Sequence, residues 1–413
     1  MAPSLTANGK ERLEAFTNVV VGTRRAPLAL TGVATADGVL SLTGAGPRVA
    51  DKPELGDVDG DTMLQLYSMA KLVTSIACVQ LEEAGKLSFD DAAVIEKHLP
   101  ELAAQGILTA VSDAGEVTTT PRTQSLTLRH LLTHTSGLAY NFASPLLAKW
   151  EAATHHGMWF ERRAGVESIT IPLLFEPGTK YVYGLGLNWA GVLVERVSGL
   201  SLEDYFHTHI FGPAGVSRAD MTFIPTDAVK ARLATMYART EGGGFAPTDA
   251  LHAVQTWQPD DVVLQSGGAG LIGSVRAWLA FMSHILRCQH KDSALSTQAF
   301  ARVFTNALPP RESHPQVYKD LGDMAHFEGI TQAQYATGAA VAHSLGLLIF
   351  EADSALGRKK GSGAWSGAAR TRFWIDPASG VAGFCGTQVL ETEWAPFAKV
   401  VDEFETLVYE ALV

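Results

Sequence analysis

The chain has 413 residues, of which 46% are hydrophobic and 18% charged, a composition that is typical of a well-packed globular protein and excludes a disordered or coiled-coil one. This length suits two or three ordinary domains, or one large enzyme with an inserted domain. The formal net charge is −11 and no basic run is present, which disfavours a nucleic-acid partner and binding to an anionic membrane surface.

The sequence shows no targeting segment and no disulfide framework. Its N-terminal residues lack a charged start followed by an apolar core, and no apolar stretch approaches the length of a membrane span. The three cysteines, Cys78, Cys288 and Cys385, stand alone in apolar contexts, without the spacing of a metal site. We therefore expect a cytoplasmic protein with buried, reduced thiols, no membrane or nucleic-acid partner, and no metal or other cofactor.

The N-terminal part is predicted to form a helix, a β-hairpin and a second helix. Residues Lys10–Val21 are predicted to form the opening helix. The β-prone runs Ala26–Thr35 and Gly38–Thr43 are separated by Ala-Asp-Gly, which is a turn signal. After a polar loop, apolar residues recur at helical spacing until Gly85 ends the second helix.

The middle of the chain, from Asp90 to about Ala325, is predicted to be mostly helical with long irregular connections. Helices are expected at Thr127–Gly137, capped by its threonine, at Leu187–Ser198 and at Ser274–Leu286. Residues Asp292–Tyr335 are uneven and polar, which indicates a surface insertion.

Strand character returns near the C-terminus. The runs Ser344–Phe350, Arg370–Ile375 and Gly380–Val389 are apolar or alternating, and Gly, Pro and Asp separate them. A last helix is predicted at Ala395–Leu412. Strands at both ends with helices between them predict an α/β fold, in which one sheet is built from the two chain ends and flanked by helices.

The same pattern predicts two domains. Residues 1–88 and 326–413 would form the α/β sheet domain, and residues 89–325 would form a large, mostly helical lobe. We expect the active site in the cleft between them.

The most informative motif is Ser68-Met-Ala-Lys71. A serine and a lysine three residues apart share one face of a helix, so the amine can take the hydroxyl proton without a histidine. No other serine in the chain has a lysine at the third following position. The pair alone is a weak signal, because Ser and Lys on a helix face are usually just solvated.

Two further segments could carry chemistry. Tyr183 follows Phe175-Glu-Pro-Gly178 and precedes a glycine-rich turn, where a phenol could point into a cleft; taken alone, a buried hydrogen-bonded tyrosine is the simpler reading. The segment Gly361–Ala368 crowds small residues around Trp365 just before a strand, so its backbone N–H groups could face a ligand closely. Taken alone, that segment could also be a flexible turn.

Together, the three segments form an ordered set that resembles the serine-reactive β-lactamase and penicillin-recognising superfamily. The resemblance runs from about Val19 to the C-terminal helix and is strongest to the esterases and transesterases related to class C β-lactamases. It implies a β-lactamase-like fold with an antiparallel sheet. The most characteristic segments are Leu131–Leu138, Pro177–Thr179, Gly267–Leu271 and Trp374–Pro377.

The resemblance implies a role for each motif residue. Ser68 matches the nucleophile of the family, Lys71 its general base, and Tyr183 the tyrosine that helps to move the proton. The backbone N–H groups of Ser68 and Ala368 would form the oxyanion hole. Five further residues are expected to bind substrate: Trp365, Ser366, Gly367, Tyr140 and Trp394.

The sequence departs from the β-lactamase pattern in two places. Gly184 and Leu185 follow the tyrosine, where class C β-lactamases have an asparagine two positions on. Trp365 replaces the lysine that helps to hold a β-lactam carboxylate. Both differences argue against efficient β-lactam hydrolysis and favour esters or thioesters with neutral, apolar acyl groups.

The implied reaction is acyl transfer through an acyl-enzyme on Ser68. A lysine with the reference pKa of about 10.4 is neutral in only about one molecule in 2,500 at pH 7. Burial can lower that pKa by several units, so Lys71 must be largely desolvated. The partners would be a small-molecule acyl donor and acceptor in secondary metabolism, with an acyl-carrier protein as a possible donor.

Several alternatives stay open at this point. The protein could be a carboxylesterase, a β-lactam-recognising hydrolase or peptidase, or a non-catalytic protein that has kept the fold. His130 and His134 lie four residues apart, as zinc ligands can on a helix, but no glutamate follows His130, and a structural role is favoured.

Overall fold

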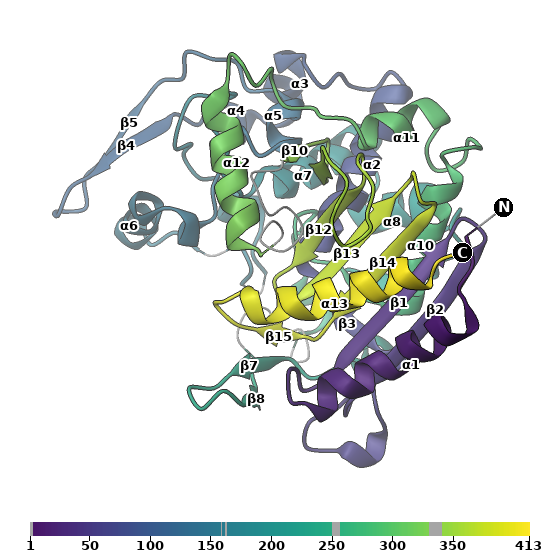
Figure 1. Ribbon diagram of the computed structural model, residues 1–413. Helices are drawn as coiled ribbons and strands as arrows, with labels where there is room; N and C mark the ends of the chain where they lie inside the picture. The colour runs from purple at the N-terminus through teal and green to yellow at the C-terminus, as the bar shows by residue number, and fades with distance from the viewer. Residues whose placement is uncertain (1–2, 158, 162, 250–256, 330–340) are drawn as a thin grey trace.

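One antiparallel sheet of seven strands, in the order β10-β11-β12-β13-β14-β1-β2, organises the computed structural model (Figure 1). The structure describes residues 3–157, 159–161, 163–249, 257–329 and 341–413. The strands are β1 (Ala29–Thr35), β2 (Gly38–Ala45), β10 (Val341–His343), β11 (Leu348–Phe350), β12 (Gly363–Gly367), β13 (Thr371–Asp376) and β14 (Val381–Gly386).

The two ends of the chain meet inside this sheet. Strand β1 pairs with β14 in the register Gly32↔Phe384, and near the termini the N–H of Ser4 donates to the carbonyl of Val413 at 3.1 Å. The predicted α/β fold, with an antiparallel sheet built from both chain ends, is confirmed. The hairpin β1–β2 turns at the Ala-Asp-Gly signal that the sequence displays.

Helices cover both faces of the sheet. Helices α1 (Ala7–Gly22) and α13 (Ala395–Ala411) pack together on one face, which is the near face in Figure 1, and α10 (Val275–Arg287) packs against β1, β2 and β14 from the other side. All residues of β1, β13 and β14 are consequently buried. Gly32 is needed at this contact, because a Cβ there would lie 2.4 Å from the side chain of Leu279 in α10.

The remaining helices gather mainly in the middle of the chain, as predicted. They are α2 (Ala70–Glu83), α3 (Ala92–His98), α4 (Pro100–Ala103), α5 (Leu128–Leu132), α6 (Pro145–Thr154), α7 (Gly186–Ser198), α8 (Leu202–Phe206), α9 (Asp227–Lys230), α11 (Thr297–Val303) and α12 (Pro315–Phe327). None of the helices in the described residues is long and apolar enough to cross a membrane.

Three small sheets in the described residues were not predicted. They pair β3 (Met63–Gln65) with β9 (Ile272–Ser274) and β6 (Met221–Thr222), β4 (Ile107–Val111) with β5 (Val117–Thr120), and β7 (Tyr237–Arg239) with β8 (Phe245–Pro247) and β15 (Val389–Leu390). Each strand has only two to five residues, which is too short for a clear alternating pattern.

Other local predictions need correction. The segment Gly361–Ala368 contains a strand, β12, rather than a turn before one. The helix predicted at Thr127–Gly137 stops after Leu132, and His134 then takes a positive φ of 57°. The predicted surface insertion Asp292–Tyr335 contains helices α11 and α12, and residues 330–335 lie outside the described part of the chain, so the insertion stays a prediction.

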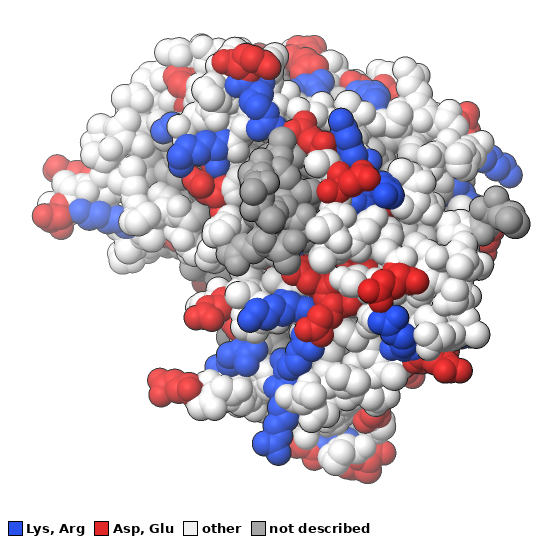
Figure 2. Space-filling view, viewed as in Figure 1, with Lys and Arg blue, Asp and Glu red and all other residues white. Residues whose placement is uncertain are grey.

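A continuous hydrophobic core joins the sheet to the middle region through α2. Eleven of the fourteen residues of α2 are buried, and the helix packs on α7. The division into residues 1–88 with 326–413 and residues 89–325 stays a prediction; in space, α10 of the middle region packs on the sheet. On the face in Figure 2, described acidic and basic side chains lie interspersed.

Candidate active site

Ser68 lies where strand β3 turns into helix α2. A short 3-10 helix, Tyr67–Met69, leads directly into α2, and Tyr67 has a φ of +46°, which non-glycine residues rarely adopt. The N–H groups of a first helical turn have no partner within the helix, and the helix dipole makes this end electropositive. Ser68 therefore combines a hydroxyl with a backbone donor at one point.

Lys71 is a buried amine whose hydrogen-bond partners are neutral. Its side chain is 1% exposed, and its Nζ lies 3.1 Å from Ser68 Oγ, 3.1 Å from the hydroxyl of Tyr140 and 2.7 Å from the carbonyl oxygen of Gly268. Burial lowers the pKa of Lys71 well below its ordinary value, and the carboxylate of Glu328 opposes this only in part. The desolvated lysine that base catalysis requires is therefore present.

Tyr183 reaches Ser68 from the other side. Its hydroxyl donates to Ser68 Oγ at 2.6 Å, and its ring centroid lies 4.7 Å from Lys71 Nζ. Burial raises the pKa of Tyr183 well above its ordinary value, so the phenol keeps its proton at neutral pH. The serine oxygen is thus held between an amine and a protonated phenol.

Two backbone segments position Tyr183. The N–H of Val182 donates to the carbonyl of His134 at 2.9 Å, and the N–H of Tyr140 donates to the carbonyl of Tyr183 at 3.3 Å. Gly184 allows this close approach, because a Cβ there would lie 2.1 Å from the carbonyl oxygen of Leu138. Gly184, the first residue after the tyrosine, therefore has a packing reason.

The end of β12 lies against the start of the Ser68 helix. A Cβ on Gly367 would lie 2.4 Å from the carbonyl oxygen of Leu66, so only glycine allows the two segments to approach this closely. Ala369 packs with Tyr67 and Met236, and Ala368 lies at the edge of this small cluster. The two segments that carry the predicted oxyanion donors, those of Ser68 and Ala368, are therefore in contact.

Trp365 and Ser366, both predicted to bind substrate, make mainly internal contacts. Trp365 is 2% exposed, stacks on His134 with a centroid distance of 5.9 Å, and packs on the ring of Tyr183 with a centroid distance of 5.5 Å. Ser366 is also buried, and its hydroxyl accepts from Arg372 Nε at 3.0 Å. A direct contact of either residue with substrate stays a prediction.

Tyr140 and Trp394 differ in their distance from the chemistry. Tyr140 is buried, and its hydroxyl hydrogen-bonds Lys71 directly. It therefore contacts the proposed base, in addition to its predicted contact with substrate. The ring of Trp394 lies 3.9 Å from the guanidinium of Arg370, at the turn that follows β12. Substrate binding by these two residues also stays a prediction.

Sequence reasoning missed three contributors. The carbonyl of Gly268 belongs to the Gly267–Leu271 segment, whose resemblance to the family was the available signal. His134, likewise within a family segment, packs on Tyr183 with a centroid distance of 4.8 Å. Glu328, at the C-terminal end of α12, acts on Lys71 and Tyr183 through its charge, and its polar stretch gave no signal.

His130 has a structural role. Its Nδ1 accepts the N–H of Thr127 at 3.2 Å and completes a capping box at the start of α5. Burial lowers the pKa of His130 to about 4, so the ring is neutral. No group of three or more metal-ligating side chains occurs among the described residues.

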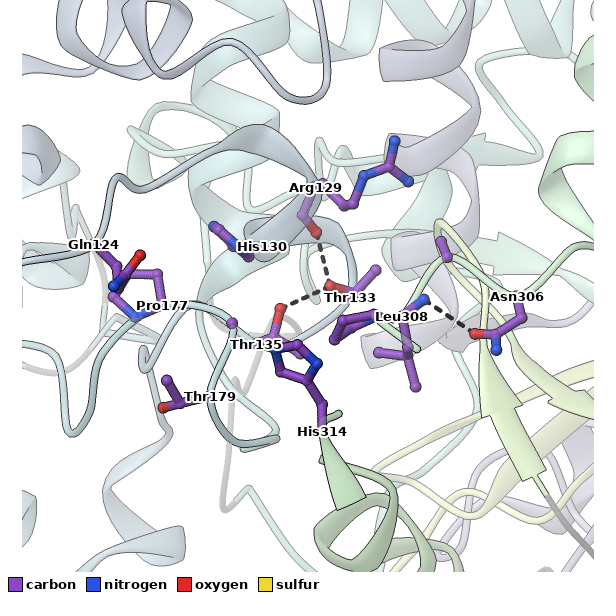
Figure 3. Close-up of a pocket in the computed structure, with 13 residues that line it drawn as sticks. Gln124, Arg129, His130, Thr133, Thr135, Pro177, Thr179, Asn306, Leu308 and His314 are labelled. Atoms are coloured by element: carbon purple, nitrogen blue, oxygen red, sulfur yellow. Dashed lines mark hydrogen bonds between the residues drawn. The ribbon is translucent and has the colours of Figure 1, made fainter. Parts of the chain in front are cut away.

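A cavity of about 590 Å³ opens beside helix α5, and Ser68 is not among its lining residues (Figure 3). His130, Thr133, Thr135 and Asn306 are among its lining residues. The hydroxyl of Thr133 bonds the carbonyl of Arg129 at 2.8 Å and the hydroxyl of Thr135 at 2.9 Å. The two threonines flank His134, whose backbone carbonyl accepts from Val182 next to Tyr183. The cavity is therefore lined by the same segment that supports Tyr183.

This arrangement of Ser68, Lys71 and Tyr183 occurs on a chain whose residues 13–393 match the family model described as Beta-lactamase. The chain belongs to the β-lactamase family. Its relatives include acyltransferase calJ of Penicillium decumbens, 33% identical over 79% of this chain and 76% of that protein. The monacolin J acid methylbutanoyltransferase of Aspergillus terreus is 30% identical over 87% of this chain and 86% of its own.

Solved structures agree with this placement. The simvastatin synthase of Aspergillus terreus, as its LovD6 mutant, has a TM-score of 0.81 and 27% identity over 98% of this chain and 95% of that chain. Segments such as Tyr183–Gly191 and Asp220–Phe223 also resemble the fungal lovastatin acyltransferase, a resemblance that these relatives confirm. The protein is therefore a β-lactamase-like enzyme of a branch whose members are named as acyltransferases and an esterase.

Proposed function

We propose that this member of the β-lactamase family is a serine acyltransferase of secondary metabolism, with Ser68 as its nucleophile. The observation that carries the proposal is the position of Ser68 Oγ, 3.1 Å from Lys71 Nζ and 2.6 Å from the hydroxyl of Tyr183. The names of the relatives support transfer to a small-molecule acceptor from a small-molecule donor.

The first half-reaction forms an ester between the acyl group and Ser68. The serine oxygen attacks the carbonyl carbon while its proton passes to neutral Lys71, and the bond to the leaving group breaks as Lys71, through Tyr183, returns a proton to it. The N–H groups of Ser68 and Ala368 would stabilise the negative oxygen of the intermediate, where each such donor typically contributes about 3 kcal/mol.

The second half-reaction reverses these steps with a new nucleophile. Lys71 takes the proton of an acceptor hydroxyl or amine, the acceptor attacks the acyl-enzyme, and Ser68 regains its proton as the leaving group. An acyl-carrier protein is a fitting donor, because a thioester is already activated for attack. We further propose that this reaction takes place in the cytoplasm, where the free, buried thiols of Cys78, Cys288 and Cys385 would stay reduced.

Hydrolysis is the second candidate function. A lovastatin esterase of Penicillium rubens is 39% identical over 173 residues, which cover 42% of this chain and 43% of that protein. Water would then replace the acceptor in the second half-reaction, with the same residues at work. β-Lactam hydrolysis is disfavoured, because Trp365 stands where β-lactamases have a lysine.

The test mixes the protein with a short-chain acyl thioester, with and without candidate alcohols, and separates free acid from acylated acceptor. We expect the alcohol to divert product from acid to ester. If no acceptor ever does so, the enzyme is an esterase. Ser68→Ala should abolish both products and prevent labelling by a fluorophosphonate; full activity in this variant would overturn the assignment.

A further inference from the structure

Strained backbone concentrates around the candidate site. Seven non-glycine residues of the described chain have a positive φ, and four of them surround Ser68: Tyr67 at +46°, His134 at +57°, Arg370 at +53° and Gln388 at +49°. Such conformations cost roughly 1–3 kcal/mol each and persist only where the surroundings hold them. Tyr67 and His134 belong to segments already described, which leaves Arg370 and Gln388 without a role.

Arg370 is a buried arginine that binds backbone carbonyls. Its residue is 2% exposed, and it occupies the turn between β12 and β13. One guanidinium nitrogen donates to the carbonyl of Ala368 at 3.1 Å, and the other donates to the carbonyls of Glu391 and, at 3.1 Å, Glu393. The planar fork of arginine thus joins the turn to the segment after β15.

Further contacts fix the guanidinium itself. Trp394 stacks on it with a distance of 3.9 Å to the ring centroid, and the carboxylate of Glu391 lies 3.4 Å from its Nε. Glu391 is shared with Arg239, which bonds it from the far side. Burial lowers the pKa of Arg370 to about 10, with Glu391 opposing this, so the side chain stays charged at neutral pH.

The backbone of the same turn is held as well. The N–H of Thr387 donates to the carbonyl of Arg370 at 3.0 Å, and the N–H of Val389 donates to the carbonyl of Ala369 at 3.1 Å. Gln388, between these donors, uses its buried side-chain amide to bond both the N–H and the carbonyl of Gln65 in β3, at 3.0 and 3.2 Å. One short segment therefore binds both the turn after β12 and the strand that leads to Ser68.

We propose that Arg370 is a positioning residue, which holds the Ala368 backbone so that its N–H and that of Ser68 converge on one oxygen. This inference rests on the proposed acyl-transfer function. Oxyanion donors act only when they point within tenths of an ångström at the developing charge, so their support must be rigid. A buried guanidinium bound to three carbonyls supplies that rigidity, because its donors form a fixed plane.

The test compares an oxygen ester with its thionoester in single-turnover acylation. Sulfur accepts hydrogen bonds weakly, so an intact oxyanion hole favours the oxygen ester, and a misplaced N–H reduces that preference. Arg370→Met should lower the oxygen-ester rate about 10- to 100-fold with little change in KM, since loss of a whole donor costs roughly 10²- to 10³-fold. The thionoester rate should fall much less.

A matched control isolates the contact with Ala368. Arg239→Met breaks the other ion pair of Glu391 without touching the turn, so both rates should stay within about twofold of the unmodified enzyme. Trp394→Leu removes the ring that stacks on Arg370 and also lies near Arg372 and Phe397, and it should reduce the oxygen-to-sulfur rate ratio slightly. This variant keeps the test decisive if Arg370→Met fails to fold.

The two levels of the proposal fail in different ways. An unchanged oxygen-to-sulfur ratio in folded Arg370→Met, or in Trp394→Leu where the former does not fold, overturns the positioning role alone. If Arg239→Met reduces the oxygen-to-sulfur rate ratio as much as Arg370→Met does, the change reflects a general loosening of this region. That result would also overturn the positioning role of Arg370. Full activity of Ser68→Ala would instead remove the acyl-transfer function on which the inference rests.

Discussion

Two buried basic side chains of this protein, Arg358 and Lys71, have opposite kinds of hydrogen-bond partner. Arg358, between β11 and β12, is 1% exposed and forms a two-pronged ion pair with Glu405 of α13, at 3.1 and 2.7 Å. Lys71 is equally buried, yet its hydrogen-bond partners are a serine, a tyrosine and a backbone carbonyl. The first arrangement keeps a charge, whereas the second favours losing one.

The difference separates a structural site from a reactive one. A carboxylate in contact favours the charged form of its partner, whereas neutral acceptors leave the cost of desolvation uncompensated. Glu328 acts on Lys71 only through its more distant field, and burial remains the larger influence on the pKa of that lysine. Burial without a contacting counterion therefore favours the neutral form of Lys71, which its proposed role as base requires.

The largest expected effect comes from exchanging lysine and arginine at positions 71 and 358. Lys71→Arg introduces a permanently charged guanidinium that cannot lose a proton near neutral pH, so kcat should fall by roughly 10²- to 10⁴-fold. Arg358→Lys keeps a charge beside Glu405 and should leave kcat within about threefold while lowering the melting temperature. Steady-state kinetics with an acyl thioester measure both, and substantial activity in Lys71→Arg would contradict the role of Lys71 as base.

The second effect concerns stability. Glu405→Gln leaves Arg358 buried beside a neutral amide, so the free energy of unfolding should fall by about 3–5 kcal/mol. Denaturant unfolding followed by circular dichroism measures this loss. Glu403→Gln is the control, because Glu403 pairs with Arg25 at the exposed surface, where such pairs contribute at most about 1 kcal/mol. Equal losses in the two variants would show that burial of the pair is unimportant.

The most gradual effect is the pH dependence of stability that Lys71 contributes. Because its pKa is lowered in the folded state, the unfolded chain binds more protons between that lowered pKa and the ordinary value of 10.5. Stability should therefore rise with pH through this window in the unmodified protein relative to Lys71→Met, by about 1.4 kcal/mol for each unit of lowering. Parallel stability curves for the two proteins would show that Lys71 keeps its charge on folding.

Local signals predicted much of the fold. The Ala-Asp-Gly turn predicted the first hairpin, and apolar spacing predicted α1, α7, α10 and α13 to within a few residues. The failures occurred where the signal was not local. Strand β12 consists largely of small residues and forms because β13 pairs along its length, and helix α5 ends early because His134 turns back to bond the segment of Val182.

The candidate site divides in the same way. Ser68, Lys71 and Tyr183 could be picked out, because a helical spacing and an ordered set of motifs mark them, and the structure brings the three side chains together. Gly268 lies in a segment that resembles the family but has no side chain to mark its role, and Glu328 and Arg370 carry no signal in the sequence. Gly268 and Glu328 act from positions about two hundred residues or more from Lys71, and Arg370 acts through three backbone carbonyls that no residue pattern reveals.

By itself, the sequence determined which chemical groups are available: a hydroxyl and an amine on one helix face, a tyrosine after Pro-Gly, and glycines that permit close backbone approach. Only the tertiary structure decided that the amine of Lys71 is desolvated, that its hydrogen-bond partners are neutral, and that two distant backbone segments meet at Ser68. The physical reason is that desolvation and donor geometry depend on what surrounds a group, and folding alone assembles those surroundings.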